Sequence, residues 1–294
     1  MTTLTSSPVL AEPLQCGRFT LTFERPLVMG ILNVTPDSFS DGGRFLSRDA
    51  ALARAEQMLA DGADMIDIGG ESTRPGAPPV PLDEELERVV PIVEALRGVQ
   101  VPLSVDTYKP AVMRAALEAG ADMINDIWGL RQDGALDAVK DSNCGLCVMH
   151  MLGEPRTMQL HEPVYDDVVA SVRDFFAERL AAFTAAGIAA NRITFDPGYG
   201  FGKTVGHNYT LLAELAATLP TGTHRALLAG MSRKSMLGAV TGRSAGERVF
   251  ASIAAAVCAA ERGAAIIRVH DVAETVDALK VWQATGQAAR RAHD

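Results

Sequence analysis

The chain has 294 residues, 48% hydrophobic and 21% charged, a composition that excludes a disordered chain and permits a large buried core. Its formal net charge of −9 argues against nucleic acid or an anionic membrane as a partner, because polyanions would be repelled. No apolar stretch is long enough to cross a bilayer, and residues 1–15 lack the features of a secretory signal, so we expect a cytoplasmic protein.

The amino-terminal segment predicts a tail followed by a small β-hairpin. We expect a flexible tail over residues 1–16 and a hairpin arm over 17–24, where Phe19, Leu21 and Phe23 alternate on one side. This arm would close the bottom of the domain that follows. The alternation of strand and helix signals then runs without a break, so we predict one domain over 17–285 and a tail over 286–294.

Eight short apolar runs each stop on, or just before, a polar side chain or loop. This pattern predicts an α/β fold, a (β/α)8 TIM barrel whose strands present chemistry only at their carboxyl ends, on one rim. The runs are Leu27–Asn33, Met65–Gly70, Val101–Asp106, Met123–Asp126, Gly145–His150, Arg192–Asp196, Ala226–Gly230 and Ala265–His270.

Helical patterns lie between the apolar runs, and several begin with Pro or end with Gly. The longest, Tyr165–Ala186, carries a wide apolar stripe that could bury either a partner or the barrel wall. The others are Arg48–Ala60, Asp83–Arg97, Pro110–Ala119, Ser244–Arg262 and Asp271–Gln283. Two long loops, Val34–Phe45 and Glu71–Pro81, follow strand ends and are interpreted as mobile lids rather than surface filler.

Two apparent motifs, a cysteine pair and a glycine-rich segment, do not indicate the functions usually associated with them. The four cysteines are too scattered for a disulfide framework, and we interpret Cys144 and Cys147 as buried thiols rather than a redox or metal pair. The glycine-rich segment Asp196–Thr204 fails the register of both a P-loop and a dinucleotide fingerprint. What remains is a flexible ledge beneath Asp196, with Phe201 able to stack on a flat ring.

Four polar residues at predicted strand ends form a chemically coherent set: Asp106, Asn125, Asp196 and Lys234. Two carboxylates, an amide and an ammonium can contact the edge groups of an aminopyrimidinone ring, whose adjacent N–H donors suit a carboxylate. For Asp106 and Asn125 the alternative is a helix N-cap.

A second set is suited to an anion. Arg268 and His270 share one face of the last strand, which in a closed barrel adjoins the strand that ends at Asn33. These three residues suit a phosphate or diphosphate, although a structural ion pair is the alternative for Arg268. Ser232–Ser235 stands at a predicted helix start that could attract a carboxylate, and Thr73 lies on the second loop.

Together these segments resemble the dihydropteroate synthase family, over roughly residues 17–280 and in order. The matching strings are NVTPDSFSDGG (Asn33–Gly43), DIGGESTRPG (Asp67–Gly76), SVDT (Ser104–Thr107), INDI (Ile124–Ile127), DPGYGFGK (Asp196–Lys203), SRKS (Ser232–Ser235) and RVHD (Arg268–Asp271). Tyr199, where Phe is common, is a mild departure.

The resemblance implies a transferase that joins 6-hydroxymethyl-7,8-dihydropterin diphosphate to 4-aminobenzoate, giving 7,8-dihydropteroate and diphosphate for folate synthesis, with sulfonamides competing for the aminobenzoate site. It also implies a homodimer and Mg²⁺. By motif position it implies a pterin site of Asp106, Asn125, Ile127, Met149, Asp196 and Lys234, a diphosphate site of Asn33, Arg268 and His270 with the metal at Asn33, and an aminobenzoate site of Thr73, Pro75, Phe201, Ser232 and Ser235. The catalytic residues would be Lys234, Arg268, His270 and Asp106.

Two other functions fit part of the pattern. A methyltetrahydrofolate-binding methyltransferase domain also grips a pterin, but it has no need of a diphosphate site such as Arg268 and His270. A paralogue that binds pterin without condensing it is disfavoured because no catalytic position is lost.

Overall fold

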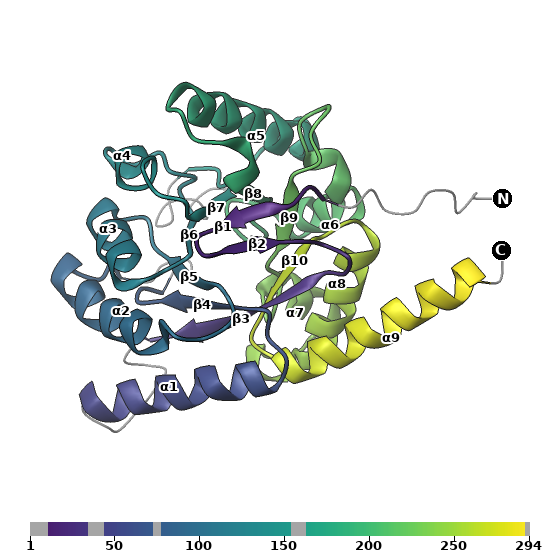
Figure 1. Cartoon of the computed structure of the whole chain (residues 1–294). Helices are drawn as coiled ribbons and strands as arrows, with labels where there is room; N and C mark the ends of the chain where they lie inside the picture. Colours follow the sequence, from purple (N-terminus) through teal and green to yellow (C-terminus); the bar gives the residue numbers. More distant parts are fainter. Residues whose placement is uncertain (1–10, 35–43, 73–77, 154–162, 292–294) are drawn as a thin grey trace.

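The centre of the molecule is a closed barrel of eight parallel strands (Figure 1). The computed structural model describes residues 11–34, 44–72, 78–153 and 163–291. In barrel order the strands are β10 (Ile266–Val269), β3 (Leu27–Asn33), β4 (Met65–Gly69), β5 (Leu103–Asp106), β6 (Met123–Asp126), β7 (Gly145–Met149), β8 (Ile193–Asp196) and β9 (Ala226–Ala229). The predicted TIM barrel is confirmed.

The register of the strands places the predicted polar residues at one level. Asn33 pairs with Gly69, Gly69 with Asp106, and Asp106 with Asn125. Because paired residues of parallel strands point to the same face, these side chains line the same end of the barrel. The strands are almost wholly buried because helices cover their outer faces, which explains their continuous apolar runs.

The helices follow the strands, with caps that the sequence explains. Pro110 starts α3, and Gly120 ends it at φ 115°, a left-handed conformation that suits glycine. Asp167 caps α5 by accepting from the backbone N–H groups of Val169 and Ala170. The helices are α1 (Arg44–Ala60), α2 (Leu82–Leu96), α3 (Pro110–Ala119), α4 (Ala135–Val139), α5 (Val168–Ala185), α6 (Val205–Ala213), α7 (Ser235–Thr241), α8 (Val249–Glu261) and α9 (Val272–Arg291), with 3-10 turns η2 (Ala190–Arg192), η3 (Leu215–Thr218) and η4 (Ala245–Glu247).

The hairpin arm is present but starts earlier than predicted. Its strands are β1 (Leu14–Cys16) and β2 (Phe19–Leu21), so the last residues of the predicted tail are part of it. Gly17, at φ 56°, opens the two-residue turn between them, which fixes the register. Leu14, Cys16 and Phe23 pack with inward-facing barrel residues such as Met29, so the arm closes the bottom as predicted (Figure 1).

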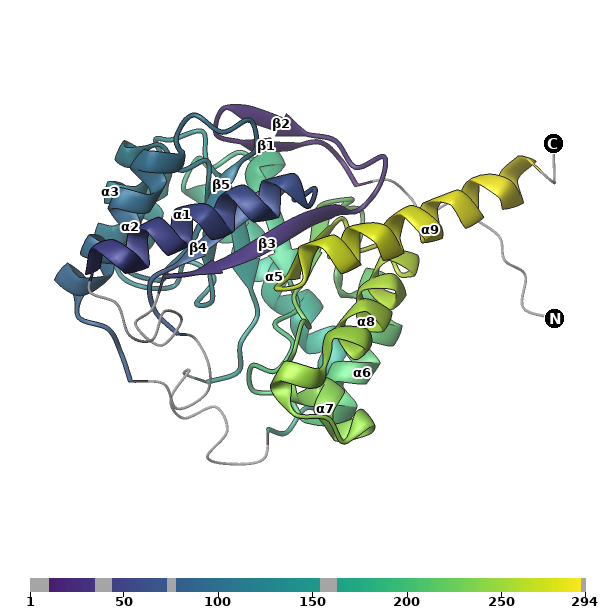
Figure 2. The same ribbon diagram turned by 90° about the horizontal axis from the view of Figure 1, so that it is seen from below.

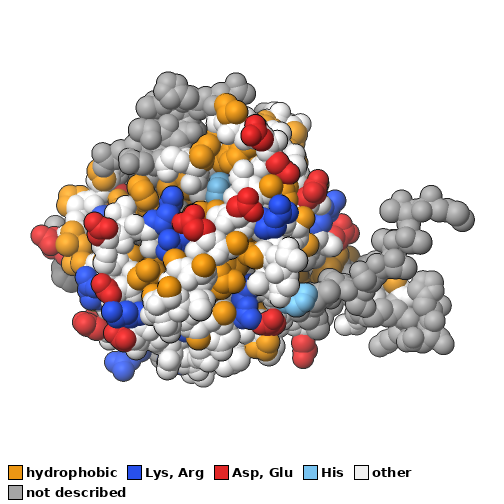
Figure 3. Space-filling view, turned by 90° about the horizontal axis from the view of Figure 1, so that it is seen from above, with side chains coloured by type: hydrophobic (Ala, Val, Ile, Leu, Met, Phe, Trp, Pro, Cys, Tyr) orange, Lys and Arg blue, Asp and Glu red, His pale blue; other side chains and the backbone are white. Residues whose placement is uncertain are grey.

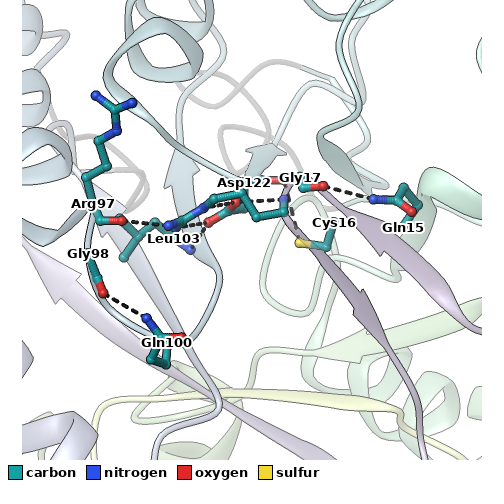
Figure 4. A network of polar contacts seen from close by, with 9 residues as sticks. Gln15, Cys16, Gly17, Arg97, Gly98, Gln100, Leu103 and Asp122 are labelled. Atoms are coloured by element: carbon teal, nitrogen blue, oxygen red, sulfur yellow. Dashed lines mark hydrogen bonds and ion pairs between the residues drawn. The ribbon is translucent and has the colours of Figure 1, made fainter.

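A polar network holds this arm in place (Figure 4). The buried Asp122 carboxylate accepts from Arg18 Nε at 2.9 Å and Nη2 at 2.8 Å, and also from the backbone N–H of Leu103. Arg18 Nη1 donates to the carbonyl of Arg97 at 2.6 Å. A Cβ on Gly17 would lie 2.5 Å from Asp122 Oδ1, so the close approach requires glycine.

Different elements of the chain lie at the two ends of the barrel. The hairpin lies at one end and α7 at the other, which is the carboxyl end of the strands (Figure 2). α9 continues past the predicted Gln283 to Arg291 and projects from the barrel (Figures 1 and 2).

The apolar stripe of α5 packs on its own chain. Val172, Phe176 and Phe183 are fully buried in the main core, which supports the interpretation as a barrel-packing face. Cys16, Cys144 and Cys147 are buried and Cys258 is partly buried, all without a disulfide, as predicted.

The surface shows acidic and basic side chains interspersed on the face seen in Figure 3. No helix in the described ranges has the length and apolar character needed to cross a membrane.

Candidate active site

The polar residues predicted to converge do converge, at the carboxyl end of the barrel. Asp106 and Asn125 are register partners on β5 and β6, and both side chains are buried. Neither caps a helix, because Lys109 and Gly134 occupy the N-cap positions of α3 and α4. The N-cap alternative is therefore wrong for both.

The two carboxylate oxygens of Asp106 differ in their hydrogen bonding. Its Oδ2 accepts from Arg268 Nη2 at 2.8 Å, but its Oδ1 is buried and has no partner among the described residues. Burial raises the pKa of Asp106 to about 7, against the opposing effect of Arg268, and the charge of Asp67 adds to the rise. An unpaired buried acceptor is costly, so this oxygen is suited to a donor brought by a ligand.

Arg268 crosses the barrel mouth to two carboxylates. Its Nε donates to Asp67 Oδ2 at 2.6 Å and its Nη2 donates to Asp106. The structural ion pair considered for this residue is thus present. The guanidinium has further N–H groups that can donate to a ligand, so the ion pair is compatible with the predicted binding of a phosphate or diphosphate.

Asp67, on β4, is a residue that the sequence reasoning missed. It is fully buried and accepts from Ser104 Oγ, Asn125 Nδ2 and Arg268 Nε. The available signal was an acidic residue inside a wholly apolar strand, because such a carboxylate must have partners.

Asp196 and Lys234 face the same space from neighbouring strand ends. Asp196 Oδ1 accepts from the N–H of Gly198 at 2.7 Å. Burial raises the pKa of Asp196, with Lys234 opposing the rise, while burial lowers the pKa of Lys234 to about 8 against the attraction of Asp196. A Cβ on Gly230 would lie 3.8 Å from both Asp196 Oδ2 and Arg268 Cβ, so this glycine keeps the space between them open.

The glycine ledge beneath Asp196 rests on the backbone after β7. Gly198 has φ 70°, and a Cβ there would lie 1.9 Å from the carbonyl oxygen of His150, so only glycine fits. Lys203, a second missed residue, is buried under the ledge and donates to the carbonyls of Gly198 and Phe201, both at 3.0 Å. Its Nζ also lies 3.0 Å from Nδ1 of His150, whose pKa burial lowers to about 2.

One wall of the site is apolar. Ile127, Met149, Met151 and Phe201 form a separate buried cluster, with Tyr108 and Trp128 packed against it. Lys234 Nζ lies 4.9 Å from the centre of the Phe201 ring. A flat ring could therefore lie between this wall and the polar side chains.

The remaining predicted residues divide into three groups. Asn33, the last residue of β3, and His270, which directly follows the adjacent strand β10, are both half-buried. Ser232 Oγ lies 3.0 Å from His270 Nδ1. Ser235 is exposed at the start of α7. Thr73 and Pro75 lie outside the described residues, as do residues 35–43 of the first predicted lid and 73–77 of the second.

Arg233 shapes the turn that carries Lys234. Its left-handed conformation, at φ 60°, is unusual for a non-glycine residue. Its backbone N–H donates to Ser252 Oγ, its carbonyl accepts from Arg248, and its guanidinium pairs with Asp271. These contacts hold the turn between Ser232 and Lys234.

The buried hydroxyl of Tyr199, in the ledge, is expected to lower the stability of the fold. The side chain is fully buried, and its hydroxyl has no partner among the described residues. Its backbone carbonyl accepts from Lys234, a bond that substitution would keep. We expect Tyr199→Phe to raise the free energy of unfolding by about 1 kcal/mol, measured by urea denaturation, because an unpaired hydroxyl leaves the core. A destabilised variant would contradict the absence of a partner.

A TIM barrel whose mouth joins buried carboxylates, an amide and two cations to an apolar wall defines the class of pterin-binding enzymes, and the family described as "Pterin binding enzyme" matches residues 29–270. The chain is 52% identical to the dihydropteroate synthase of Escherichia coli K12 over 270 residues, 90% of this chain and 93% of that one. The Burkholderia cenocepacia dihydropteroate synthase complexed with 7,8-dihydropteroate is 68% identical with a TM-score of 0.90, covering 96% of this chain and 99% of that one. The Yersinia pestis enzyme in a sulfonamide complex is 51% identical with a TM-score of 0.88, covering 94% and 100%.

The chain therefore belongs to the dihydropteroate synthase family. It is a transferase, and its reaction is the condensation that forms 7,8-dihydropteroate in folate synthesis. The family resemblance found in the sequence motifs is confirmed.

Proposed function

We propose that the barrel mouth carries out this condensation with a division of labour between its residues. The assignment rests on Oδ1 of Asp106, which is buried and has no hydrogen-bond partner in the described ranges. Asp106, Asn125, Asp196 and Lys234 would bind the pterin edge, and Ile127 and Met149 would pack on its faces. Asp196 and Lys234 carry the opposite charges that can pair with a ring's N–H donors and its carbonyl acceptor.

The diphosphate end would lie on the other side of Arg268. Arg268 and His270 supply donors, and Asn33 supplies a carboxamide oxygen. A Cβ on Gly69 would lie 3.7 Å from Asn33 Oδ1 and 3.8 Å from Asp106 Cβ, and this closeness of Asn33 to Asp106 supports a diphosphate end next to the proposed pterin site.

These residues fit Mg²⁺ as the cofactor. No cluster of three or more His, Cys, Asp or Glu side chains suited to a metal occurs in the described part of the chain. Mg²⁺ does not need one, because it keeps waters and binds through one or two protein oxygens plus phosphate. Asn33 is the residue that would hold it, and the ion would neutralise charge on the departing diphosphate.

The chain's own residues would drive a dissociative displacement. An aromatic amine is a weak nucleophile, so help is needed where negative charge grows on the leaving group, at Arg268 and His270. The carboxylates of Asp106 and Asp196 would stabilise the cation developing on the pterin methylene. Carbon–oxygen cleavage releases diphosphate, the amine nitrogen of 4-aminobenzoate bonds to the methylene carbon, and the amine loses a proton. No covalent enzyme intermediate is needed.

The aminobenzoate site is proposed at Thr73, Pro75, Phe201, Ser232 and Ser235. Phe201 supports this because its ring lines the mouth beside Lys234. Ser232 lies at the strand end next to His270.

One assay tests the function. Diphosphate release should require Mg²⁺, the pterin diphosphate and 4-aminobenzoate together, and a sulfonamide should block it. Pterin binding without release would identify a silent paralogue instead. The methyltransferase alternative is disfavoured because the matched relatives are synthases.

Pterin affinity should depend on pH in a bell shape. Asp106 must be ionised to accept N–H donors, and its pKa of about 7 sets the acid limb. Lys234 must be protonated, and its pKa of about 8 sets the alkaline limb. Calorimetric titration with 6-hydroxymethylpterin from about pH 5 to about pH 10 should show greatest affinity between these values. Lys234→Arg should remove the alkaline limb, and a flat profile would contradict both assignments.

The remaining proposals concern assembly and location. We propose a homodimer, as the family resemblance implied, and a cytoplasmic location. Phe250 on α8 is 81% exposed and Val281 on α9 is 68% exposed, which leaves apolar surface for a partner copy. Sedimentation equilibrium of the full chain would measure the mass.

A further inference from the structure

The buried carboxylate of Asp67 connects three other strands and has no role in the proposed reaction. It lies one layer below the mouth on β4, with no exposed surface. Ser104 Oγ donates to its Oδ1 at 2.6 Å, from β5. Asn125 Nδ2 donates at 3.2 Å from β6, and Arg268 Nε donates at 2.6 Å from β10, both to Oδ2.

The chemistry of this contact fixes the orientation of Asn125. An ionised carboxylate has only acceptors, and Arg268 pairs with Asp67 as its cation. The carboxamide of Asn125 must therefore turn its NH2 group toward Asp67. The oxygen of the planar group then faces away from Asp67 and is left as an acceptor.

We propose that Asp67 is a positioning residue that sets the polarity of the pterin site. It makes Asn125 present an oxygen rather than an N–H group, and it holds Arg268 across the mouth. The inference rests on the proposed pterin site and adds a reason for its specificity. Only a ring that has an N–H donor facing the Asn125 oxygen can form a hydrogen bond there. Asp67 itself would touch no substrate.

An exchange of the two side chains tests this. Asp67→Asn should let the Asn125 amide turn over and weaken binding of 6-hydroxymethylpterin about tenfold, the loss of roughly one hydrogen bond to a charged group. Asn125→Asp should do the same by placing two carboxylates face to face. In the double variant the donor lies at 67 and the acceptor at 125, with total charge unchanged. Its affinity should return to within about threefold of the wild type.

Two further measurements distinguish a positioning role of Asp67 from a general loss of stability. Ser104→Ala removes another hydrogen bond to Asp67 and should lower stability to urea without changing pterin affinity. In steady state, Asp67→Asn should raise the KM for the pterin diphosphate and leave the KM for 4-aminobenzoate unchanged.

The outcomes separate this inference from the function on which it rests. A double variant that binds as weakly as the two single losses combined would overturn the positioning role, as would an equal effect of Ser104→Ala. Wild-type protein that fails to bind 6-hydroxymethylpterin would instead overturn the proposed pterin site.

Discussion

Asp196→Ala is expected to lower kcat/KM for the pterin diphosphate roughly ten- to hundredfold, the effect of losing charged hydrogen bonds of ~1.5–3 kcal/mol. Asp196 has two tasks in the structure. One oxygen accepts from Gly198 and holds the start of the ledge, while the other faces the space beside Gly230. The substitution therefore removes a proposed pterin contact and loosens the ledge that carries Phe201.

Steady-state kinetics and binding measure the effect. Asp137→Ala is the matched control, because it removes a carboxylate from an exposed pair with Lys140 on α4. We expect that control to keep wild-type kinetics. Undiminished turnover of the Asp196 variant would contradict the proposal that Asp196 binds the pterin.

The strand ends could be predicted from sequence because two signals coincided there. Each buried parallel strand is a continuous apolar run, and it stops where the first polar side chain can reach the mouth. β3 and β6 have the predicted bounds, and the others differ by a residue or two. Register followed from barrel closure, so the convergence of Asp106 with Asn125 needed no structural information.

The parts that sequence did not predict depend on tertiary contacts. α6 was missed because its capping box uses His207 at the third position, where Glu or Gln is the usual signal. The glycine spacing around Lys203 already excluded a nucleotide motif, but the burial of Lys203 under the ledge depends on carbonyl contacts that the spacing does not reveal. Asp67 lies one layer below the mouth, and its partners come from strands that are distant in sequence.

Arg268→Ala is expected to cost about 3–5 kcal/mol of stability, because it leaves two buried carboxylates without their cation. Asp67 is fully buried and Asp106 is 7% exposed, so water cannot replace the lost partner. The loss should be larger near pH 8 than near pH 5, since burial raises the pKa of Asp106 to about 7 and protonation below that value removes its uncompensated charge. Urea denaturation at the two pH values would measure it.

The same variant separates a structural from a substrate-binding role. If Arg268 also binds the leaving group, Arg268→Ala should weaken the diphosphate-bearing substrate more than free hydroxymethylpterin, when both are titrated under conditions where the variant is folded. Arg268→Lys is the matched comparison: it keeps one positive charge but cannot reach both carboxylates with fixed geometry. We expect it to recover part of the stability and less of the discrimination between the two ligands. Equal loss for both ligands in Arg268→Ala would mean that Arg268 serves only to hold Asp67 and Asp106 in place.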